Sequence, residues 1–138
     1  MDCGGLNLGQ DDGQVAAVAT GLRVIYEDVL GAATDGSLTW ESLRPGIEIA
    51  RLHKDGEEGS ASALLRYEAG ARLARHEHIG FELIYVLSGS QTDDAGEHRA
   101  GSLLIHGPGT THAISSKNGC IVLAMWEKPV RFIVKVEG

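Results

Sequence analysis

Basic side chains are scarce in this chain of 138 residues. Lys and Arg number 12 against 19 Asp and Glu, which gives a formal net charge of −7 at pH 7. Proteins that bind nucleic acid usually carry a basic stripe that replaces the counterions of the phosphate backbone. The sequence has no such stripe, so we expect no nucleic-acid partner.

Hydrophobic runs long enough to span a membrane are also missing. The longest apolar runs, 83–87 and 121–126, have the length of strands, whereas a spanning helix takes about twenty apolar residues. The N-terminus carries Asp2, Asp11 and Asp12, where a secretory leader would have basic residues and an apolar core. We therefore expect a cytoplasmic protein with no membrane partner.

Cysteine, proline and aromatic residues are rare. The two cysteines, Cys3 and Cys120, lie 117 positions apart, which argues against a disulfide framework and fits reduced thiols. We interpret Cys120 as a buried, unreactive thiol, because no neighbour in the sequence would lower its pKa. Three prolines and 5% aromatics against 19 glycines favour many turns and short strands over long helices.

The remaining composition, 43% apolar and 22% charged residues, is that of one globular domain. Apolar stretches recur at roughly eight-to-twelve-residue spacing between Gly- or Asx-rich turns, which is typical of an all-β sandwich or barrel. We expect a partly mobile N-terminal arm over 1–37 and the folded domain over 38–138. The expected strands are 22–29, 47–52, 63–67, 72–78, 81–87, 103–105 and 120–126.

Histidine and glutamate gather in one segment of the chain. His76 and His78 are two positions apart, so on a strand both imidazoles project from one face, about 7 Å apart along the chain. Gly80 permits a bend before Glu82 opens the next strand, and His112 follows on a candidate antiparallel return strand. Two histidines at this spacing are weak evidence by themselves. Three imidazoles and one carboxylate, however, suit a transition ion such as Zn, Fe or Mn and not Mg or Ca.

The wider spacing resembles the two signature motifs of the cupin superfamily. The first motif is matched at each fixed position by Gly70, His76, His78, Glu82 and Gly89. The second is matched by Gly101, Gly107, Gly109 and His112. It departs from the family twice, because Gly107 replaces the usual proline, with Pro108 displaced by one position, and Ser116 replaces the terminal Asn. Neither departure affects a candidate metal ligand.

Further segments resemble the ChrR-type group of cupins, namely Trp40, 44–47, 64–70, 101–102 and 118–120. That group includes the C-terminal domain of zinc anti-sigma factors and stand-alone proteins related to diketone-cleaving dioxygenases. The resemblance implies a cupin double-stranded β-helix, which is a jelly-roll barrel. It also implies one divalent transition ion per chain, Fe(II), Zn or Mn, with the ligands His76, His78, Glu82 and His112.

Strand alternation predicts what surrounds this site. It places Ile84 and Val86 on the face of Glu82, and Ala74 on the face of His76. These apolar neighbours predict a pocket for a small-molecule substrate beside the ion.

Other residues have two readings each. Arg66 reaches either into the pocket or to a partner on the surface, and Trp126 either caps the mouth of the pocket or packs in the core. We interpret His106 as a rim residue at a strand end rather than a further interior imidazole. His53 and His98 lie beside polar loops and are interpreted as solvated.

Three functions stay open at this point. The favoured one is an O₂-dependent dioxygenase that acts on a small enolisable ketone or phenolic compound, with Glu82 as the catalytic candidate. The second is a lyase or isomerase that uses Zn or Mn as a Lewis acid. The third is a non-catalytic sensor related to ChrR-type regulators, which the short, histidine-free leading segment disfavours. By analogy with small cupins, strand 22–29 predicts a homodimer.

Overall fold

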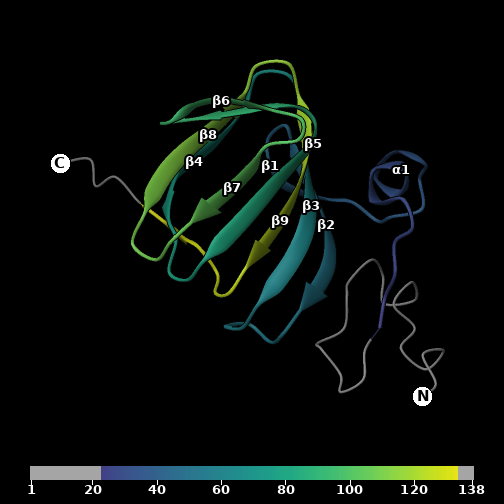
Figure 1. Cartoon of the computed structure of the whole chain (residues 1–138), viewed down its shortest axis with the longest axis horizontal. Coiled ribbons are helices and arrows are strands. Elements are labelled where there is room, and N and C mark those ends of the chain that lie inside the picture. Colours follow the sequence, from purple (N-terminus) through teal and green to yellow (C-terminus); the bar gives the residue numbers. More distant parts are fainter. Residues whose placement is uncertain (1–22, 134–138) are drawn as a thin grey trace.

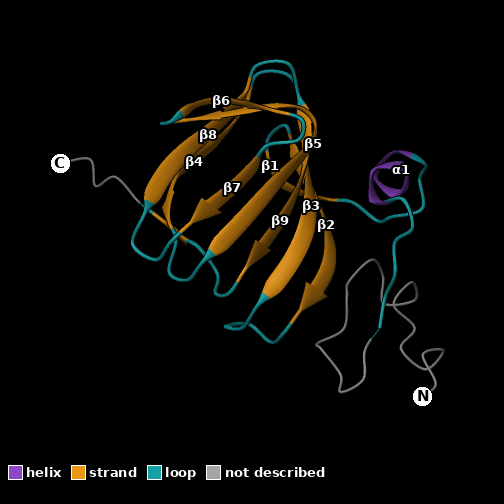
Figure 2. Cartoon of the chain, in the orientation of Figure 1, coloured by secondary structure: helices purple, strands orange, loops and turns teal. Residues whose placement is uncertain are grey.

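The computed structural model of the chain describes residues 23–133. Within that range the backbone forms ten strands and one short helix (Figure 2). The elements are α1 (Val29–Thr34), β1 (Glu41–Arg44), β2 (Ile47–Lys54), β3 (Ala61–Tyr67), β4 (Ala71–Glu77), β5 (Glu82–Asp93), β6 (Gly96–Arg99), β7 (Leu103–His106), β8 (Thr111–Ser116), β9 (Cys120–Trp126) and β10 (Arg131–Phe132). The predicted all-β class is confirmed. The helix has neither the length nor the hydrophobicity to cross a lipid bilayer.

The strands curl into a jelly-roll barrel, which confirms the predicted architecture (Figure 1). They pair in the order β1-β2-β3-β9-β5-β8-β4-β10, and β6 and β7 also pair with β5. Every pairing is antiparallel. Six of the strands predicted from the sequence overlap β2, β3, β4, β5, β7 and β9.

Strand β5 joins the two walls of the barrel because it bends in its middle. Its first half pairs with β7 and β9, and its second half pairs with β6 and β8. The bend lies at Gly89, where φ is +71°. A side chain there would collide with the carbonyl oxygen of Gly119, so the position requires glycine. The bend carries the end of β5 across to β8, where part of the candidate site is built.

The barrel has an apolar interior and a second, smaller apolar cluster outside. Inside, alternate residues of facing strands are buried together, among them Ile49, Leu65, Ile84, Val86 and Val122. Outside, Ala33 of α1 packs against Ala50 and Leu64. The face of β2 and β3 that points away from the interior is therefore covered near α1.

The strand predicted over 22–29 is wrong for the described residues. Residues 23–28 form no strand, and α1 begins at Val29. The Asp28 side chain accepts a hydrogen bond from the backbone N–H of Gly31 at 2.9 Å, and such an N-cap favours a helical turn over an extended chain. The homodimer inferred from this strand stays a prediction, and residues 1–22 of the predicted arm lie outside the described residues.

Candidate metal centre

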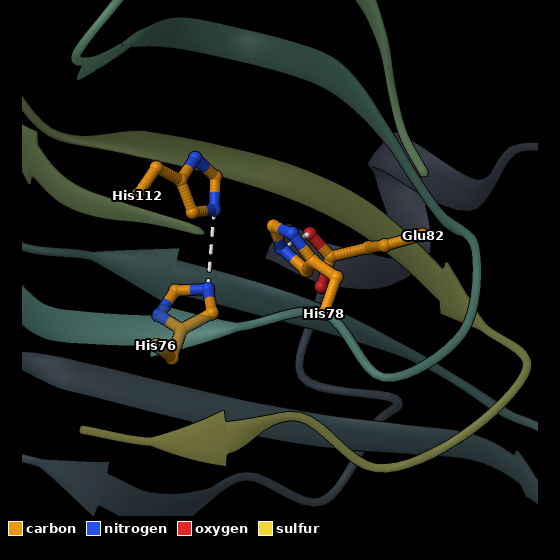
Figure 3. Close-up of side chains that lie close together, drawn as sticks. All are labelled: His76, His78, Glu82 and His112. Carbon is orange, nitrogen blue, oxygen red and sulfur yellow. Dashed lines mark hydrogen bonds and ion pairs between the residues drawn. The ribbon is translucent and has the colours of Figure 1, made fainter. Parts of the chain in front are cut away.

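Four buried side chains from three parts of the barrel lie close together (Figure 3). His76 lies on β4 directly opposite His112 of β8, His78 follows β4, and Glu82 begins β5. One nitrogen or oxygen of each side chain lies within 4.8 Å of the others. All four residues are buried, with at most 5% of their surface exposed. The structure thus brings together the four ligands predicted from the sequence.

A β-bulge in β4 sets the direction of His76. Between Leu73 and His76 the strand advances three residues, while β8 advances only two, from Ile114 to His112. The extra residue reverses the alternation, so Leu73 is buried and Ala74 is exposed. The prediction that Ala74 shares the face of His76 is therefore wrong.

The loop between β7 and β8 holds His78 in place. The backbone N–H of His78 donates to the carbonyl oxygen of Thr110 at 2.9 Å, and the N–H of Gly109 donates to the carbonyl oxygen of His78 at 2.8 Å. Gly109 has a φ of +88°, which is a conformation that favours glycine. A glycine of the second motif thus positions a ligand of the first.

Each candidate histidine ligand has a hydrogen-bond partner at the ring nitrogen that points away from the centre. The Nδ1 partners are the Ala74 carbonyl oxygen for His76 at 3.0 Å, Thr110 Oγ1 for His78 at 2.9 Å and Asp93 Oδ2 for His112 at 2.9 Å. Thr110 Oγ1 already donates to the Gly107 carbonyl oxygen at 2.7 Å, so it accepts from His78. These bonds favour a proton on Nδ1 and direct the Nε2 lone pairs to the centre.

The donor set at the centre fits a cation. His76 Nε2 and His112 Nε2 are 3.1 Å apart and cannot hydrogen-bond to each other while both rings carry their proton on Nδ1. Burial lowers the pKa of both imidazoles and so favours their neutral forms. His78 Nε2 and Glu82 Oε1 face each other at 2.9 Å, buried and without a well-formed hydrogen bond. Such a set of unpaired lone pairs suits a divalent transition ion.

Glu82 supplies the negative charge of this set. Burial by itself raises the pKa of Glu82, but the interactions with His106 and His78 outweigh it and hold the pKa at about 2. The carboxylate is therefore ionised at neutral pH and available as a ligand.

His106 lies in the centre, not on the rim, which corrects the prediction from the sequence. Its ring stacks on that of His78, with centroids 4.7 Å apart and an interplanar angle of 13°. His106 Nδ1 is 3.6 Å from Glu82 Oε1, and its Nε2 is 3.8 Å from Asp93 Oδ2. The Glu82 carboxylate raises the pKa of His106.

The register of β7 explains this placement. β7 pairs with β5 so that His106 stands opposite Glu82, and Leu103 and Ile105 point outward, 56% and 62% exposed. Because Leu103, Leu104 and Ile105 are all apolar, the sequence of β7 does not indicate which face is interior.

Asp93 is a functional candidate that sequence reasoning missed. Its carboxylate, with 4% of the side chain exposed, accepts from His112 Nδ1 at 2.9 Å and from His98 Nε2 at 2.8 Å. Burial raises its pKa, but the hydrogen bonds from His112, His98 and the Ala95 N–H dominate and hold the pKa at about 2. In the sequence Asp93 belongs to the polar Asp-Asp-Ala-Gly turn, where nothing distinguishes it from a solvated turn residue.

The two histidines interpreted as solvated are in fact partly buried and hydrogen-bonded. His98 binds Asp93, as described above, and is linked through it to the centre. His53 Nδ1 lies 2.9 Å from Ser62 Oγ on β3, away from the four candidate ligands. Cys120 is buried as predicted, and burial raises its pKa.

A cavity of about 140 Å³ adjoins the centre and is lined mostly by apolar side chains. His76, Glu82, Ile84 and Trp126 contribute to its wall. Val86 shares the face of Glu82 but is fully buried in the core rather than part of this wall. The lining thus includes two of the four residues expected in a substrate pocket.

Arg66 lies outside the cavity, which corrects the reading that places it in the pocket. It alternates with the buried Leu65 and Tyr67 and points to the outer face of β3. Its Nη2 donates to Glu48 Oε1 at 2.8 Å, and its guanidinium lies 4.1 Å from the ring centroid of Trp40. Partners on the outer face therefore hold this side chain away from the interior.

We predict that Asp93→Asn weakens metal binding by about 10- to 100-fold, the usual effect of losing a partner that orients a metal ligand. The substitution removes the charge that the His112 Nδ1–H faces. Competition with a chromogenic chelator measures the affinity. The neighbouring Asp94→Asn is the control, because Asp94 is exposed and pairs with Arg75 at 2.8 Å. Equal losses in the two variants would contradict the role assigned to Asp93.

The fold and the site together define a class of protein. A jelly-roll barrel with three histidines and one glutamate converging inside it is the arrangement of the cupins, and solved cupin structures superpose on the chain. The sequence profile of the ChrR cupin-like domain matches residues 31–130. The chain therefore belongs to the ChrR cupin-like domain family. No curated protein sequence matches it significantly.

Three solved structures illustrate the range of proteins that share this fold. Acetylacetone dioxygenase from Acinetobacter johnsonii has 18% identity and a TM-score of 0.67, over 88% of this chain and 83% of that one. The complex of SigE with the anti-sigma ChrR from Rhodobacter sphaeroides has 24% identity and a TM-score of 0.61, over 83% of this chain and 71% of that one. The polyketide cyclase RemF from Streptomyces resistomycificus has 21% identity and a TM-score of 0.61, over 72% of this chain and 82% of that one. At such identities the likeness shows the fold alone.

Proposed function

We propose that this chain is an O₂-dependent dioxygenase that holds Fe(II) through His76, His78, Glu82 and His112. Its substrate would be a small enolisable ketone, such as a β-dicarbonyl compound, or a phenolic compound. The observation that carries the proposal is the cluster of four buried donor atoms beside a small apolar cavity. The fold shared with acetylacetone dioxygenase gives further support.

The protein's own residues have distinct parts in this proposal. Bound iron would supply Lewis acidity toward the substrate oxygens and redox chemistry toward O₂. Glu82 adds a negative charge beside the three imidazoles, which lowers the net positive charge of the centre and eases electron donation. Ile84 and Trp126 contribute apolar surface to the cavity wall, so that bulk water is kept from reactive species.

A second candidate function is a lyase or isomerase that uses Zn or Mn as a Lewis acid. The observation that favours it is His106, an imidazole that is not among the four ligands yet lies 3.6 Å from Glu82 Oε1 with 17% of its side chain exposed. An imidazole in such a place can transfer protons to and from a substrate. A sensor role, as the family of anti-sigma ChrR suggests, is the remaining alternative.

Oxygen consumption tests the proposal. Metal-stripped protein is reconstituted with Fe(II) without air and then mixed with β-dicarbonyl or hydroxyaryl ketones and O₂. We expect substrate-dependent oxygen uptake with Fe(II) and none with Zn(II), since zinc has no redox chemistry. Glu82→Ala should lower the uptake more than it lowers the iron content.

The matched control is Glu48→Ala, because Glu48 pairs with Arg66 on the outer face of the barrel. Its uptake and iron content should equal those of the wild type. The dioxygenase proposal fails if no substrate consumes O₂ with Fe(II). Turnover of a lyase or isomerase substrate by the Zn or Mn protein would then favour the second candidate function.

A further inference from the structure

Gln91 is a buried polar residue whose side-chain amide makes no well-formed hydrogen bond within residues 23–133. It is 0% exposed, and neither its Nε2 nor its Oε1 makes such a bond there. A glutamine amide can donate two hydrogen bonds and accept two, and an unsatisfied buried polar group destabilises a fold. Gln91 lines the same cavity as His76 and Glu82. Gln91 therefore brings an amide without a well-formed hydrogen bond to the wall of the cavity that adjoins the metal centre.

Strand β5 places Gln91 close to this centre. The residue follows the bend at Gly89 and precedes Asp93 by two positions. Residues two apart on a strand share a face and lie about 7 Å from each other. Asp93 contacts the candidate ligand His112. Gln91 therefore lies about 7 Å along the strand from a residue that touches the metal centre.

Tyr67 adds a second polar group to the same cavity wall. It is 4% exposed. Burial above all raises the pKa of Tyr67, the negative charge of Glu82 adds to the rise, and the nearby Gln91 amide offsets only part of it. Tyr67 therefore stays a neutral hydroxyl that can donate a hydrogen bond. The two side chains form a small polar patch in an otherwise largely apolar wall.

We propose that Gln91 and Tyr67 form a subsite for an uncharged hydrogen-bonding group of the substrate, a carboxamide or a hydroxyl. This group is distinct from the two oxygens that bind at the metal centre. The inference rests on the proposed function, which assigns the dicarbonyl end of the substrate to the metal centre.

The charges of the wall argue for a neutral group. The cation that lines the cavity, Arg51, is already paired with Glu41 at 2.9 Å, so a carboxylate at Gln91 would be buried without a free counter-charge. An ammonium group would have only the Glu82 carboxylate of this wall to pair with, and the proposed metal centre uses that carboxylate as a ligand. A carboxamide or hydroxyl both donates and accepts, and so complements the amide of Gln91. The volume of about 140 Å³ restricts the substrate to a small molecule.

Two matched β-diketones test the subsite, one that ends in a carboxamide and one that ends in a methyl group instead. Calorimetric titration of the metal-loaded wild type should show about tenfold tighter binding of the carboxamide compound. Gln91→Met keeps a side chain of similar length without its polar atoms, and it should abolish this preference. Because it also removes an unsatisfied buried amide, Gln91→Met should raise the melting temperature by about 3 °C.

Ser116→Ala is the matched control. Ser116 is also fully buried, but its hydroxyl donates to the Ser90 carbonyl oxygen at 2.7 Å and does not line the cavity. This variant should melt lower than the wild type and keep the preference for the carboxamide.

Equal binding of the two compounds to the wild type would overturn the subsite, and would mean that Gln91 holds water alone. A preference that survives in Gln91→Met, or a lower melting temperature of that variant, would also overturn it. The proposed function is tested separately by oxygen uptake of the Fe(II) wild type with the methyl compound. If that uptake is absent while the preference for the carboxamide persists, the dioxygenase proposal fails and the subsite stands.

Discussion

His78→Ala should lose nearly all of the bound metal, from one ion per chain to a small fraction of that amount. His78 is 1% exposed, and its Nε2 is 2.9 Å from Glu82 Oε1, so the substitution removes one of the four donor atoms that converge on the centre. Loss of a residue that only hydrogen-bonds to a metal ligand already costs about 10- to 100-fold in metal affinity. Loss of a ligand itself should lower the metal affinity by more than about 100-fold. Elemental analysis of protein purified without added metal measures the result.

The fold of His78→Ala should persist, because the interior of the barrel is a separate apolar cluster. Circular dichroism with the strand signature of the wild type would show this. The control is His53→Ala, since His53 binds Ser62 and Ser60 and contacts none of the four ligands. If folded His78→Ala contains as much metal as the wild type, the assignment of the ligands is wrong.

The four candidate ligands could be found from the sequence because their positions depend on local geometry. His76 and His78 are separated by one residue, and the turn at Gly80 connects them directly to Glu82. Turn residues before His112 indicate a returning strand. The motif spacing of the cupins supplied the rest, including the jelly-roll topology, which no local pattern determines.

The surroundings of the ligands were harder to predict because they depend on register between distant strands. His106 faces Glu82 only because β7 pairs with β5 in one particular register. Asp93 reaches His112 because β5 bends at Gly89 and crosses to β8. The bulge in β4 moved Ala74 to the surface against simple alternation. Gly89 marks the bend, but the sequence indicates neither the strand to which the bend leads, nor the register of β7, nor the bulge in β4.

Strand alternation also failed for the role of Arg66, for a different reason. The sequence shows that Arg66 shares a face with Leu64, but not which face of β3 is the inner one. Both faces of β3 are buried, one in the barrel interior and one beneath α1 and Trp40. An apolar neighbour on the strand therefore does not indicate the interior.

Removal of the metal by a strong chelator should lower the melting temperature by on the order of 10 °C. A ligand that binds only the folded state stabilises it by mass action, by about 4 kcal/mol at a thousandfold excess over the dissociation constant. In this protein the effect has a structural basis. Without a cation, the Nε2 lone pairs of His76 and His112 remain 3.1 Å apart in a buried site, and Glu82 is ionised there.

Differential scanning calorimetry with and without chelator measures this shift, and two histidine variants locate its origin. His53→Ala should keep the full shift, because His53 has no bond to the site. His98→Ala should keep only part of it, since His98 Nε2 donates to the Asp93 carboxylate that orients His112. The sequence placed both histidines in solvent, and two solvated histidines would give variants that behave alike. A full shift in His98→Ala would show that the Asp93 carboxylate orients His112 without this bond, whereas a reduced shift in His53→Ala would mean that the metal is held elsewhere.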